Sequence, residues 1–200
     1  MPATDIPFLY LASTSPRRRE LLTQLGVPFE VLTVQVDESP LPGEDATAYV
    51  QRLASHKAQA GWSQVALAAQ APVLGADTTV VLGSQILGKP ANRGEAIDML
   101  LALSGRTHVV LTAIARATGW ERVKRCSRSE VTFCPIEPAL AAAYWDTGEP
   151  ADKAGGYAIQ GFGARFVQHL SGSFSGVMGL PLYETAQLLT EARVPQWRVQ

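Results

Sequence analysis

One segment, Pro72 to Leu82, limits the fold of this chain more than any other. It is a run of mostly apolar residues, rich in Val and Leu, that is interrupted by a single carboxylate, Asp77. Such a run is typical of a strand buried within a sheet. Because a carboxylate in apolar surroundings costs several kcal/mol of folding free energy unless it is paired, hydrogen-bonded or metal-bound, we expect Asp77 to have a specific partner.

Helix and strand signals alternate along the first half of the chain, and a hairpin interrupts them in the second. Strands are expected at residues 8–12, 29–33, 72–82, 85–87, 108–117, 122–133 and 164–170. Helices are expected at residues 16–25, from 47 onward, 92–103, 138–145 and 181–191. Residues 118–120 form the turn of the hairpin, and Asn92 with Glu95 resembles a capping box. This order predicts an α/β fold with a mixed sheet and helices on its faces.

Length and composition indicate a globular protein. The chain has 200 residues, of which 46% are hydrophobic, and a mass of 21.4 kDa. This suits one large domain, or two lobes that share a core, better than two independent domains. The two cysteines, Cys126 and Cys134, are too few for a disulfide framework, and eight positions apart on one strand they would share a face as small core residues.

The charge balance excludes several classes of partner. A formal net charge of −1 excludes a polybasic surface over the whole molecule, and therefore binding to nucleic acid or anionic membrane through charge alone. No apolar run approaches the roughly 18 residues of a membrane span. Residues 1–10 lack the basic start of a signal peptide, so a cytoplasmic protein is expected.

A candidate anion site follows the first strand. Three hydroxyl residues lead into a helix whose first turn carries three consecutive arginines, Arg17, Arg18 and Arg19. Free backbone N–H groups at a helix N-terminus bind anions, and Ser13 and the guanidinium groups would add donors for a phosphate. The alternative is an ordinary solvated helix start. We favour the phosphate site, because arginines at this end oppose the helix dipole unless an anion accompanies them.

Asp77 is a candidate metal ligand or general base, since open α/β sheets bind ligands at strand ends. The alternative is a structural role, in which Asp77 caps a neighbouring loop. Glu38, in the acidic loop at 37–40, would supply a second oxygen to a hard cation such as Mg²⁺. By spacing alone, Glu38 is more typical of a solvated turn.

Several common motifs are absent from the sequence. It contains no P-loop and no Gly-x-Ser-x-Gly elbow, and its three histidines, His56, His108 and His169, lack the spacing of metal ligands. The glycine-rich stretch at 152–163 has no strand–turn–helix context, which rejects a dinucleotide fingerprint. It predicts a loop with unusual backbone angles instead.

Seven ordered motifs resemble the Maf family of nucleoside triphosphate pyrophosphatases. They are Leu11–Leu22, Arg52–Ala58, Gly75–Thr78, Gly88–Pro90, Leu103–Gly105, Asp152–Gly161 and Gly179–Pro181. The resemblance extends from about Phe8 to Leu189. It implies a single domain over residues 1–200 with two lobes around a central cleft, like the inosine triphosphate pyrophosphatases, and a long, twisted mixed sheet with flanking helices.

The resemblance also implies an activity and its residues. The activity is hydrolysis of a nucleoside triphosphate to the monophosphate and pyrophosphate, with a divalent cation (Mg²⁺, Mn²⁺ or Co²⁺) as cofactor. Asp77 matches the catalytic acid, and Glu38 with Asp77 would hold the metal. The positions that match the phosphate-binding residues are Ser13, Arg18, Lys57 and Lys89.

Three positions indicate the branch of the family. Arg17, Thr78 and Gln160 resemble the branch that acts on dTTP and UTP, whereas the 7-methyl-GTP branch carries Trp, Gln and Glu there. Gln160 offers a donor and an acceptor, which suits the O4/N3–H edge of uracil and thymine. Phe174, where many relatives carry Tyr, and His56, where an acidic or polar residue is common, depart from the family pattern.

We therefore expect a dTTP/UTP pyrophosphatase that limits misincorporation of unwanted nucleotides, with a link to cell division arrest. Two alternatives stay open: a nucleotide-binding regulator of cell division with little turnover, and a pyrophosphatase for modified purine nucleotides. The role of Asp77, as general base or metal ligand, is also open. The expected partner is the nucleotide, without nucleic acid or membrane, and a homodimer is a candidate assembly.

Overall fold

Seven strands form one mixed, open sheet in the computed structural model, which describes residues 9–65, 71–119 and 121–197. The strands are β1 (Leu9–Leu11), β2 (Phe29–Val31), β3 (Val73–Leu82), β4 (Gln85–Leu87), β5 (Thr107–Thr118), β6 (Glu121–Phe133) and β7 (Val167–Ser171). Their order is β2-β1-β3-β5-β6-β7, with β4 paired to β3. β1 is parallel to β2 and β3, whereas β4 and β7 are antiparallel to their neighbours. The predicted α/β class is confirmed; Phe8 and Trp120, assigned to a strand and a turn, lie outside the described residues.

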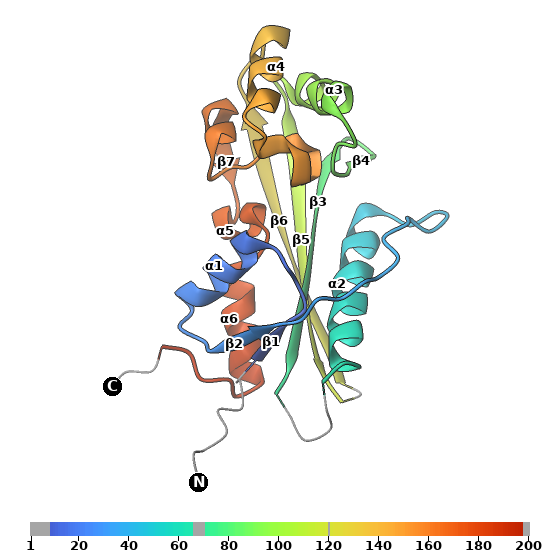
Figure 1. Ribbon diagram of the computed structural model, residues 1–200, viewed down its shortest axis with the longest axis vertical. Helices are drawn as coiled ribbons and strands as arrows, with labels where there is room; N and C mark the ends of the chain where they lie inside the picture. The colour runs from blue at the N-terminus through green and yellow to red at the C-terminus, as the bar shows by residue number, and fades with distance from the viewer. Residues whose placement is uncertain (1–8, 66–70, 120, 198–200) are drawn as a thin grey trace. The chain divides into compact units, whose positions relative to one another are not determined.

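Six α-helices occur in the described residues (Figure 1). They are α1 (Pro16–Gln24), α2 (Ala46–Trp62), α3 (Arg93–Leu103), α4 (Pro138–Asp146), α5 (Phe174–Met178) and α6 (Leu182–Glu191). Three short 3₁₀ turns follow α4: η1 (Glu149–Asp152), η2 (Ala154–Gly156) and η3 (Phe162–Phe166). No helix in the described ranges is both long and apolar enough to cross a membrane.

The contacts divide the chain into two compact units. The first comprises residues 1–77, 113–126 and 179–200, and the second comprises residues 78–112 and 127–178. Strands β3, β5 and β6 are each divided between the two units. The two units are described separately below.

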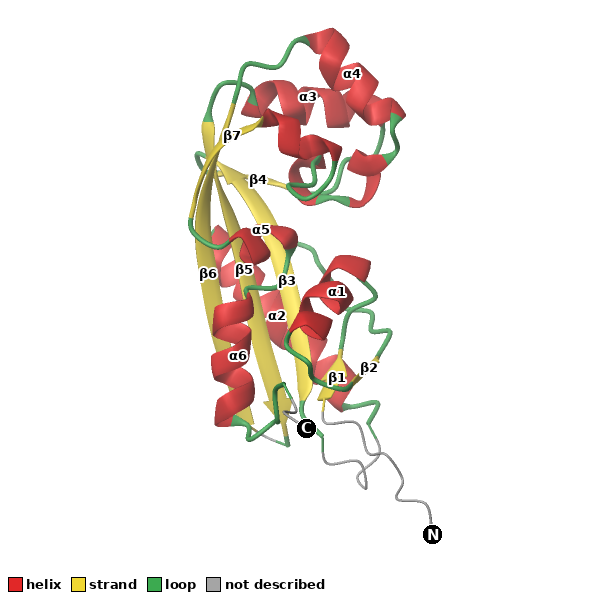
Figure 2. Ribbon diagram, turned by 90° about the vertical axis from the view of Figure 1, so that its left-hand side faces the viewer, coloured by secondary structure: helices red, strands yellow, loops and turns green. Residues whose placement is uncertain are grey.

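In the first unit, helices lie on both faces of the strands. Helix α2 lies on one face and α6 on the other (Figures 1 and 2). β1 is central to this part, because it pairs with β2 on one side and β3 on the other. The apolar stripe predicted for α1 is confirmed, since Leu21, Leu22 and Leu25 are all buried.

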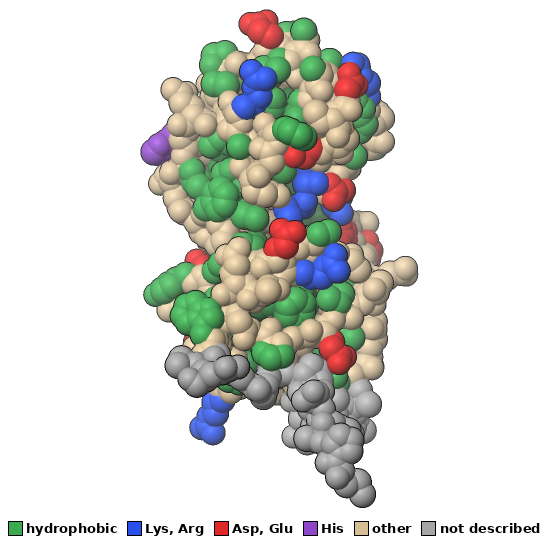
Figure 3. Space-filling model, turned by 60° about the vertical axis from the view of Figure 1, so that its left-hand side comes forward, with side chains coloured by type: hydrophobic (Ala, Val, Ile, Leu, Met, Phe, Trp, Pro, Cys, Tyr) green, Lys and Arg blue, Asp and Glu red, His purple; other side chains and the backbone are tan. Residues whose placement is uncertain are grey.

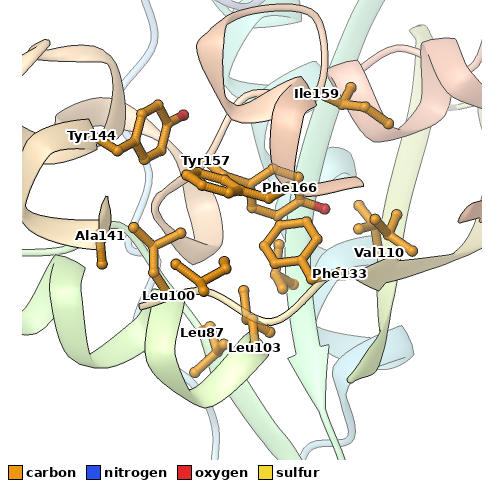
Figure 4. Close-up of a cluster of buried hydrophobic side chains, with 13 residues drawn as sticks. Leu87, Leu100, Leu103, Val110, Phe133, Ala141, Tyr144, Tyr157, Ile159 and Phe166 are labelled. Atoms are coloured by element: carbon orange, nitrogen blue, oxygen red, sulfur yellow. The ribbon is translucent and has the colours of Figure 1, made fainter. Parts of the chain in front are cut away.

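In the second unit, α3 and α4 pack together over an aromatic core (Figures 2 and 4). Phe133 and Tyr157 meet edge to face with ring centroids 4.8 Å apart, and Phe166 meets Tyr144 in the same way at 5.1 Å. The capping box predicted for α3 forms in part: Asn92 accepts the N–H of Glu95 at 3.0 Å, whereas the Glu95 carboxylate accepts the N–H of Ala91 and not that of Asn92. Burial of this cluster gives the unit its own hydrophobic core.

Two expectations need correction, and one helix was not predicted. The strand predicted at 164–170 begins only at Val167, because residues 162–166 form a 3₁₀ turn whose first two N–H groups bind the Glu149 carboxylate and so cannot join a sheet ladder. Helix α5 was not predicted, since its central Gly176 is a weak helix former. Cys126 and Cys134 are half-buried, form no disulfide in the described part of the chain and are not core residues, and Cys134 lies beyond the end of β6. The expected loop at 152–163 is confirmed in part, with positive φ at Gly155 and Gly156 but also short 3₁₀ turns.

Buried His108 makes the stability of the fold sensitive to acid. Its Nε2 lies 2.8 Å from Tyr157 Oη, and its Nδ1 has no hydrogen-bond partner in the described part of the chain. Burial lowers the pKa of His108 from 6.5 to about 4. The unfolded chain therefore binds one more proton than the folded chain between these two pH values. We expect this group to lower the free energy of unfolding by up to about 3 kcal/mol as the pH falls from about 6.5 to about 4.

Urea unfolding of wild type, His108→Gln and His169→Gln between pH 4 and 7 tests this prediction. His108→Gln loses packing at every pH but lacks the titration, so its stability should depend less on pH than that of the wild type. His169 is exposed, and its variant should follow the wild type. Identical slopes for wild type and His108→Gln would contradict the assignment.

Candidate functional site

Hydrogen bonds to Ser13 and Gly179 hold the side chain of Arg18, in the first turn of α1. Buried Ser13 accepts hydrogen bonds from Ser15 N at 3.3 Å and from Arg18 Nη1 at 3.2 Å. Arg18 Nε donates to the carbonyl oxygen of Gly179 at 2.8 Å. These bonds hold the guanidinium beside the N-terminus of α1, which has no acidic residue in its first turn. The arrangement places a positive charge at a helix N-terminus, which is where proteins commonly bind phosphate.

A charged triad lies between α2, β3 and the loop after β2. Lys57 Nζ is 2.7 Å from Asp77 Oδ1 and 2.7 Å from Glu38 Oε1. The side chains of Lys57 and Asp77 are only 14% and 11% exposed, whereas that of Glu38 is 51% exposed. The partner expected for buried Asp77 is therefore Lys57. The alternative role of Asp77, as a cap of a neighbouring loop, is not observed among its described contacts.

Gly75 explains why α2 lies close enough to form this triad. A Cβ atom at Gly75 would overlap the carbonyl oxygen of Ala54 and the backbone nitrogen of Ala58, both on α2. Side chains two positions apart on a strand share a face, so Asp77 points to the same side as Gly75. Lys57 lies between these two alanines along α2, and its side chain reaches Asp77 across the contact.

Burial shifts the pKa values of Asp77 and Arg18. Burial raises the pKa of the Asp77 carboxyl above its ordinary value, although the positive charges of Lys57 and Arg18 act in the opposite direction. Burial likewise lowers the pKa of Arg18, while Asp77 opposes that shift. A carboxylate with raised proton affinity, close to cations, is typical of a general base.

An ion pair that sequence reasoning did not assign holds the acidic loop. Arg52 donates from Nε and Nη2 to the two carboxylate oxygens of Glu44, at 2.6 and 2.7 Å, and from Nη2 to Ser39 O at 3.0 Å. Tyr49 Oη donates to the carbonyl oxygen of Glu38 at 2.9 Å. Hydrogen bonds from Arg52 lower the pKa of Glu44 to about 2. Tyr49 and Arg52 are three residues apart on α2, a spacing that shares one helix face and could have indicated their common role.

Four predicted site residues remain to be placed: Arg17, Thr78, Lys89 and Gln160. Arg17 is half-buried in the first turn of α1, beside Arg18. Thr78 follows Asp77 on β3, so it points to the opposite face, and its Oγ1 lies 3.0 Å from Thr112 Oγ1. Lys89 is exposed after β4, and Gln160 is exposed just before η3. Ser13 with Arg18, and Lys57 with Glu38 and Asp77, are thus the two sets brought into direct contact; Thr78, Lys89 and Gln160 belong to the second unit.

The donor set of the triad fits a hard divalent cation. Glu38 and Asp77 place two carboxylates around one ammonium group, which shows that both face the same point. Mg²⁺ is commonly held by one or two carboxylates that are completed by substrate phosphates. Clusters of three or more His, Cys, Asp or Glu with metal-binding geometry are absent from the described residues.

Comparison with known proteins identifies the family of this chain. A family model described as “Maf-like protein” matches residues 8–192. The chain belongs to the Maf family. The match confirms the family that the seven sequence motifs predicted.

Curated relatives are similar to this Maf chain over nearly their whole length. A dTTP/UTP pyrophosphatase of Pseudoalteromonas atlantica is 54% identical over 183 residues, which cover 91% of this chain and 95% of that protein. One of Saccharophagus degradans is 53% identical over 191 residues, covering 95% of this chain and 91% of that protein. One of Xanthomonas campestris is 55% identical over 185 residues, covering 91% of this chain and 97% of that protein.

The surface of the Maf chain agrees with its balanced charge. On the face drawn in Figure 3, acidic and basic side chains alternate with hydrophobic ones, and the described residues form no broad basic area there.

The close approach at Gly75 leads to a test of the packing beneath the site. We expect Gly75→Ala to lower the free energy of unfolding by about 1–3 kcal/mol, because the added methyl group must displace backbone atoms of α2. Gly88→Ala is a matched control, since its Cβ would meet nothing within 4 Å. Urea unfolding of both variants measures the difference, and equal stabilities would contradict the role given to Gly75.

Proposed function

We propose that this chain is a nucleoside triphosphate pyrophosphatase that hydrolyses dTTP and UTP to the monophosphate and pyrophosphate. The observation that carries the proposal is the buried contact between Lys57 and Asp77, with Glu38 on the same ammonium group. It combines a general base with a phosphate-binding cation in a chain whose relatives are named dTTP/UTP pyrophosphatases. A cytoplasmic location follows from this substrate, because nucleoside triphosphates are used there for nucleic-acid synthesis.

The cations of the chain would bind the triphosphate. The substrate carries about four negative charges, and more charge gathers on the leaving group as the bond breaks. Arg18 would bind phosphate oxygens beside Ser13, and Lys57 and Lys89 would offset the charge on the departing pyrophosphate. Glu38 and Asp77 would hold the divalent cation, which when bound supplies further positive charge to the phosphates.

Asp77 would supply the base for hydrolysis. In the proposed reaction a water oxygen bonds to the α-phosphorus, and the bond from that phosphorus to the bridging oxygen of the β-phosphate breaks. Asp77 orients this water and accepts its proton, for which burial has raised its proton affinity. Lys57, already in contact with Asp77, keeps the carboxylate in place before the substrate arrives.

Base selectivity is assigned to Gln160, with Arg17 and Thr78. The Gln160 amide carries one donor and one acceptor group, which match the N3–H and O4 of uracil and thymine. A purine has a larger ring system, which would place its own donor and acceptor groups away from an amide positioned for the pyrimidine edge, and polar groups left unpaired cost binding free energy. This supports a pyrimidine substrate within the Maf family.

A panel of triphosphates tests the activity. We expect pyrophosphate release from UTP and dTTP to exceed that from ATP and GTP, with little dependence on the 2′-hydroxyl, because the base edge is what the site reads. Release should stop in EDTA and return with Mg²⁺, Mn²⁺ or Co²⁺, because Glu38 and Asp77 are hard oxygen ligands. Equal kcat/KM for UTP and GTP would contradict the pyrimidine assignment. Binding without release from any triphosphate would favour the nucleotide-binding regulator, and preference for modified purines would favour the second alternative, a pyrophosphatase for modified purine nucleotides.

A single substitution tests the base. We expect Asp77→Asn to lower kcat for UTP by about a thousandfold or more, because the amide cannot accept the proton from water. Affinity for UTP measured without the divalent cation should be unchanged or tighter, since a negative charge beside the triphosphate is removed. Asp98→Asn, the same change at an exposed position of α3, should leave both constants unchanged. Near-normal kcat in a folded Asp77→Asn variant would remove Asp77 from the mechanism.

A further inference from the structure

The Glu149 carboxylate binds the turn that follows Gln160. Its Oε2 accepts the N–H of Phe162 at 2.9 Å, and its Oε1 accepts the N–H of Gly163 at 3.0 Å. Both amides lie two or three residues after Gln160, whereas Glu149 comes from the separate turn η1. The carboxylate therefore fixes the backbone on the C-terminal side of Gln160.

Tyr144, on α4, fixes the other side of the same turn. Its hydroxyl donates to Glu149 Oε1 at 2.6 Å and accepts the N–H of Ala158 at 3.1 Å. The ring is buried in the aromatic core against Phe166 (Figure 4). Burial and the contact with Glu149 raise the pKa of the Tyr144 phenol, so its proton stays in place as the donor. Hydrogen bonds thus hold the backbone both before and after Gln160.

Two glycines make room for these side chains. A Cβ at Gly161 would overlap the Glu149 carboxylate, and one at Gly163 would lie 2.6 Å from Tyr144 Oη. Burial of the Glu149 carboxylate raises its proton affinity, but the bonds from Tyr144, Gly163 and Phe162 outweigh this and hold its pKa below the ordinary value. An ionised carboxylate with three donors is a strong acceptor set, so this contact resists displacement.

Gln160 itself is left out of this network. Its side chain is exposed, while the preceding Ile159 is buried and the following residues are bound through their backbone. A side chain on a backbone that is fixed at both ends loses less conformational entropy when it binds a ligand. The network consequently presents one polar side chain and restrains the backbone that carries it.

We propose that Glu149, together with Tyr144, is a positioning residue for base selectivity, which holds the 158–163 turn so that the Gln160 amide meets the pyrimidine edge in one geometry. The inference rests on the proposed function, in which Gln160 reads the base. Neither Glu149 nor Tyr144 touches the substrate. Their effect passes through the backbone amides of Ala158, Phe162 and Gly163.

Glu149→Gln is the central variant. Its amide nitrogen would face one of the two N–H groups, donor against donor, so one anchoring bond is lost while size and shape are kept. Loss of one such bond to a charged acceptor corresponds to about tenfold in affinity. We expect the ratio of kcat/KM for UTP to that for GTP to fall about tenfold, mainly through a higher KM for UTP. Glu149→Asp, which keeps the charge, should recover part of the ratio.

A double-mutant cycle with Gln160→Ala separates positioning from general stability. If Glu149 acts through Gln160, then Glu149→Gln should change the UTP/GTP ratio little in a chain that already carries Gln160→Ala. Hydrogen exchange of the 158–163 backbone should speed up in Glu149→Gln whether or not substrate is present. Glu137→Gln, the same change at an exposed residue before α4, should change neither measurement.

The outcomes distinguish this inference from the proposed function. Wild-type enzyme without a UTP preference would overturn both. A wild type that prefers UTP, with Glu149→Gln lowering UTP and GTP turnover equally or acting additively with Gln160→Ala, would overturn the positioning role alone. A lower ratio that is absent from the Gln160→Ala background, together with faster exchange of the turn, would establish it.

Discussion

The burial of the Asp77 carboxylate, away from water, is the constraint on which the rest of the site depends. A buried carboxylate in the middle of β3 needs a partner, and the Lys57 ammonium on α2, which packs closely on that face, supplies it. The absence of a side chain at Gly75 permits that packing, and the alanines of α2 provide the matching surface. Lys57, Glu38 and the acidic loop are then arranged around a single charge that the sheet would otherwise exclude.

Part of this arrangement could be predicted from the sequence. The apolar run with Asp77 indicated both the buried strand and the need for a partner, because the cost of an unpaired buried charge does not depend on the fold. The pattern of leucines in α1 and the capping box of α3 are local, so they were also predictable. The family motifs added Lys57, but neither spacing nor periodicity alone could show that it is the partner of Asp77.

Other features depend on contacts that leave no periodic signal. Glu149 binds backbone amides 13 and 14 residues away, and any residue type can supply such an amide. The same bonds convert the start of a predicted strand into η3, although residues 164–170 have strand-like composition. The pair between Arg52 and Glu44 likewise joins a helix to a loop, and only the three-residue spacing of Tyr49 and Arg52 hinted at it. Tertiary hydrogen bonds to main-chain groups are therefore the part of this structure that sequence patterns describe least well.

The turn that carries Gln160 is held by hydrogen bonds to its backbone and not by the Gln160 side chain. This has a consequence for how such a protein can evolve. Because main-chain amides and two glycines define the turn, the identity of the side chain at position 160 is not needed to build it. Replacement of that one residue would change the chemical groups offered to a ligand while the surrounding scaffold is inherited unchanged. New ligand preferences are then accessible through single substitutions that carry little risk to folding, which favours divergence within a common architecture.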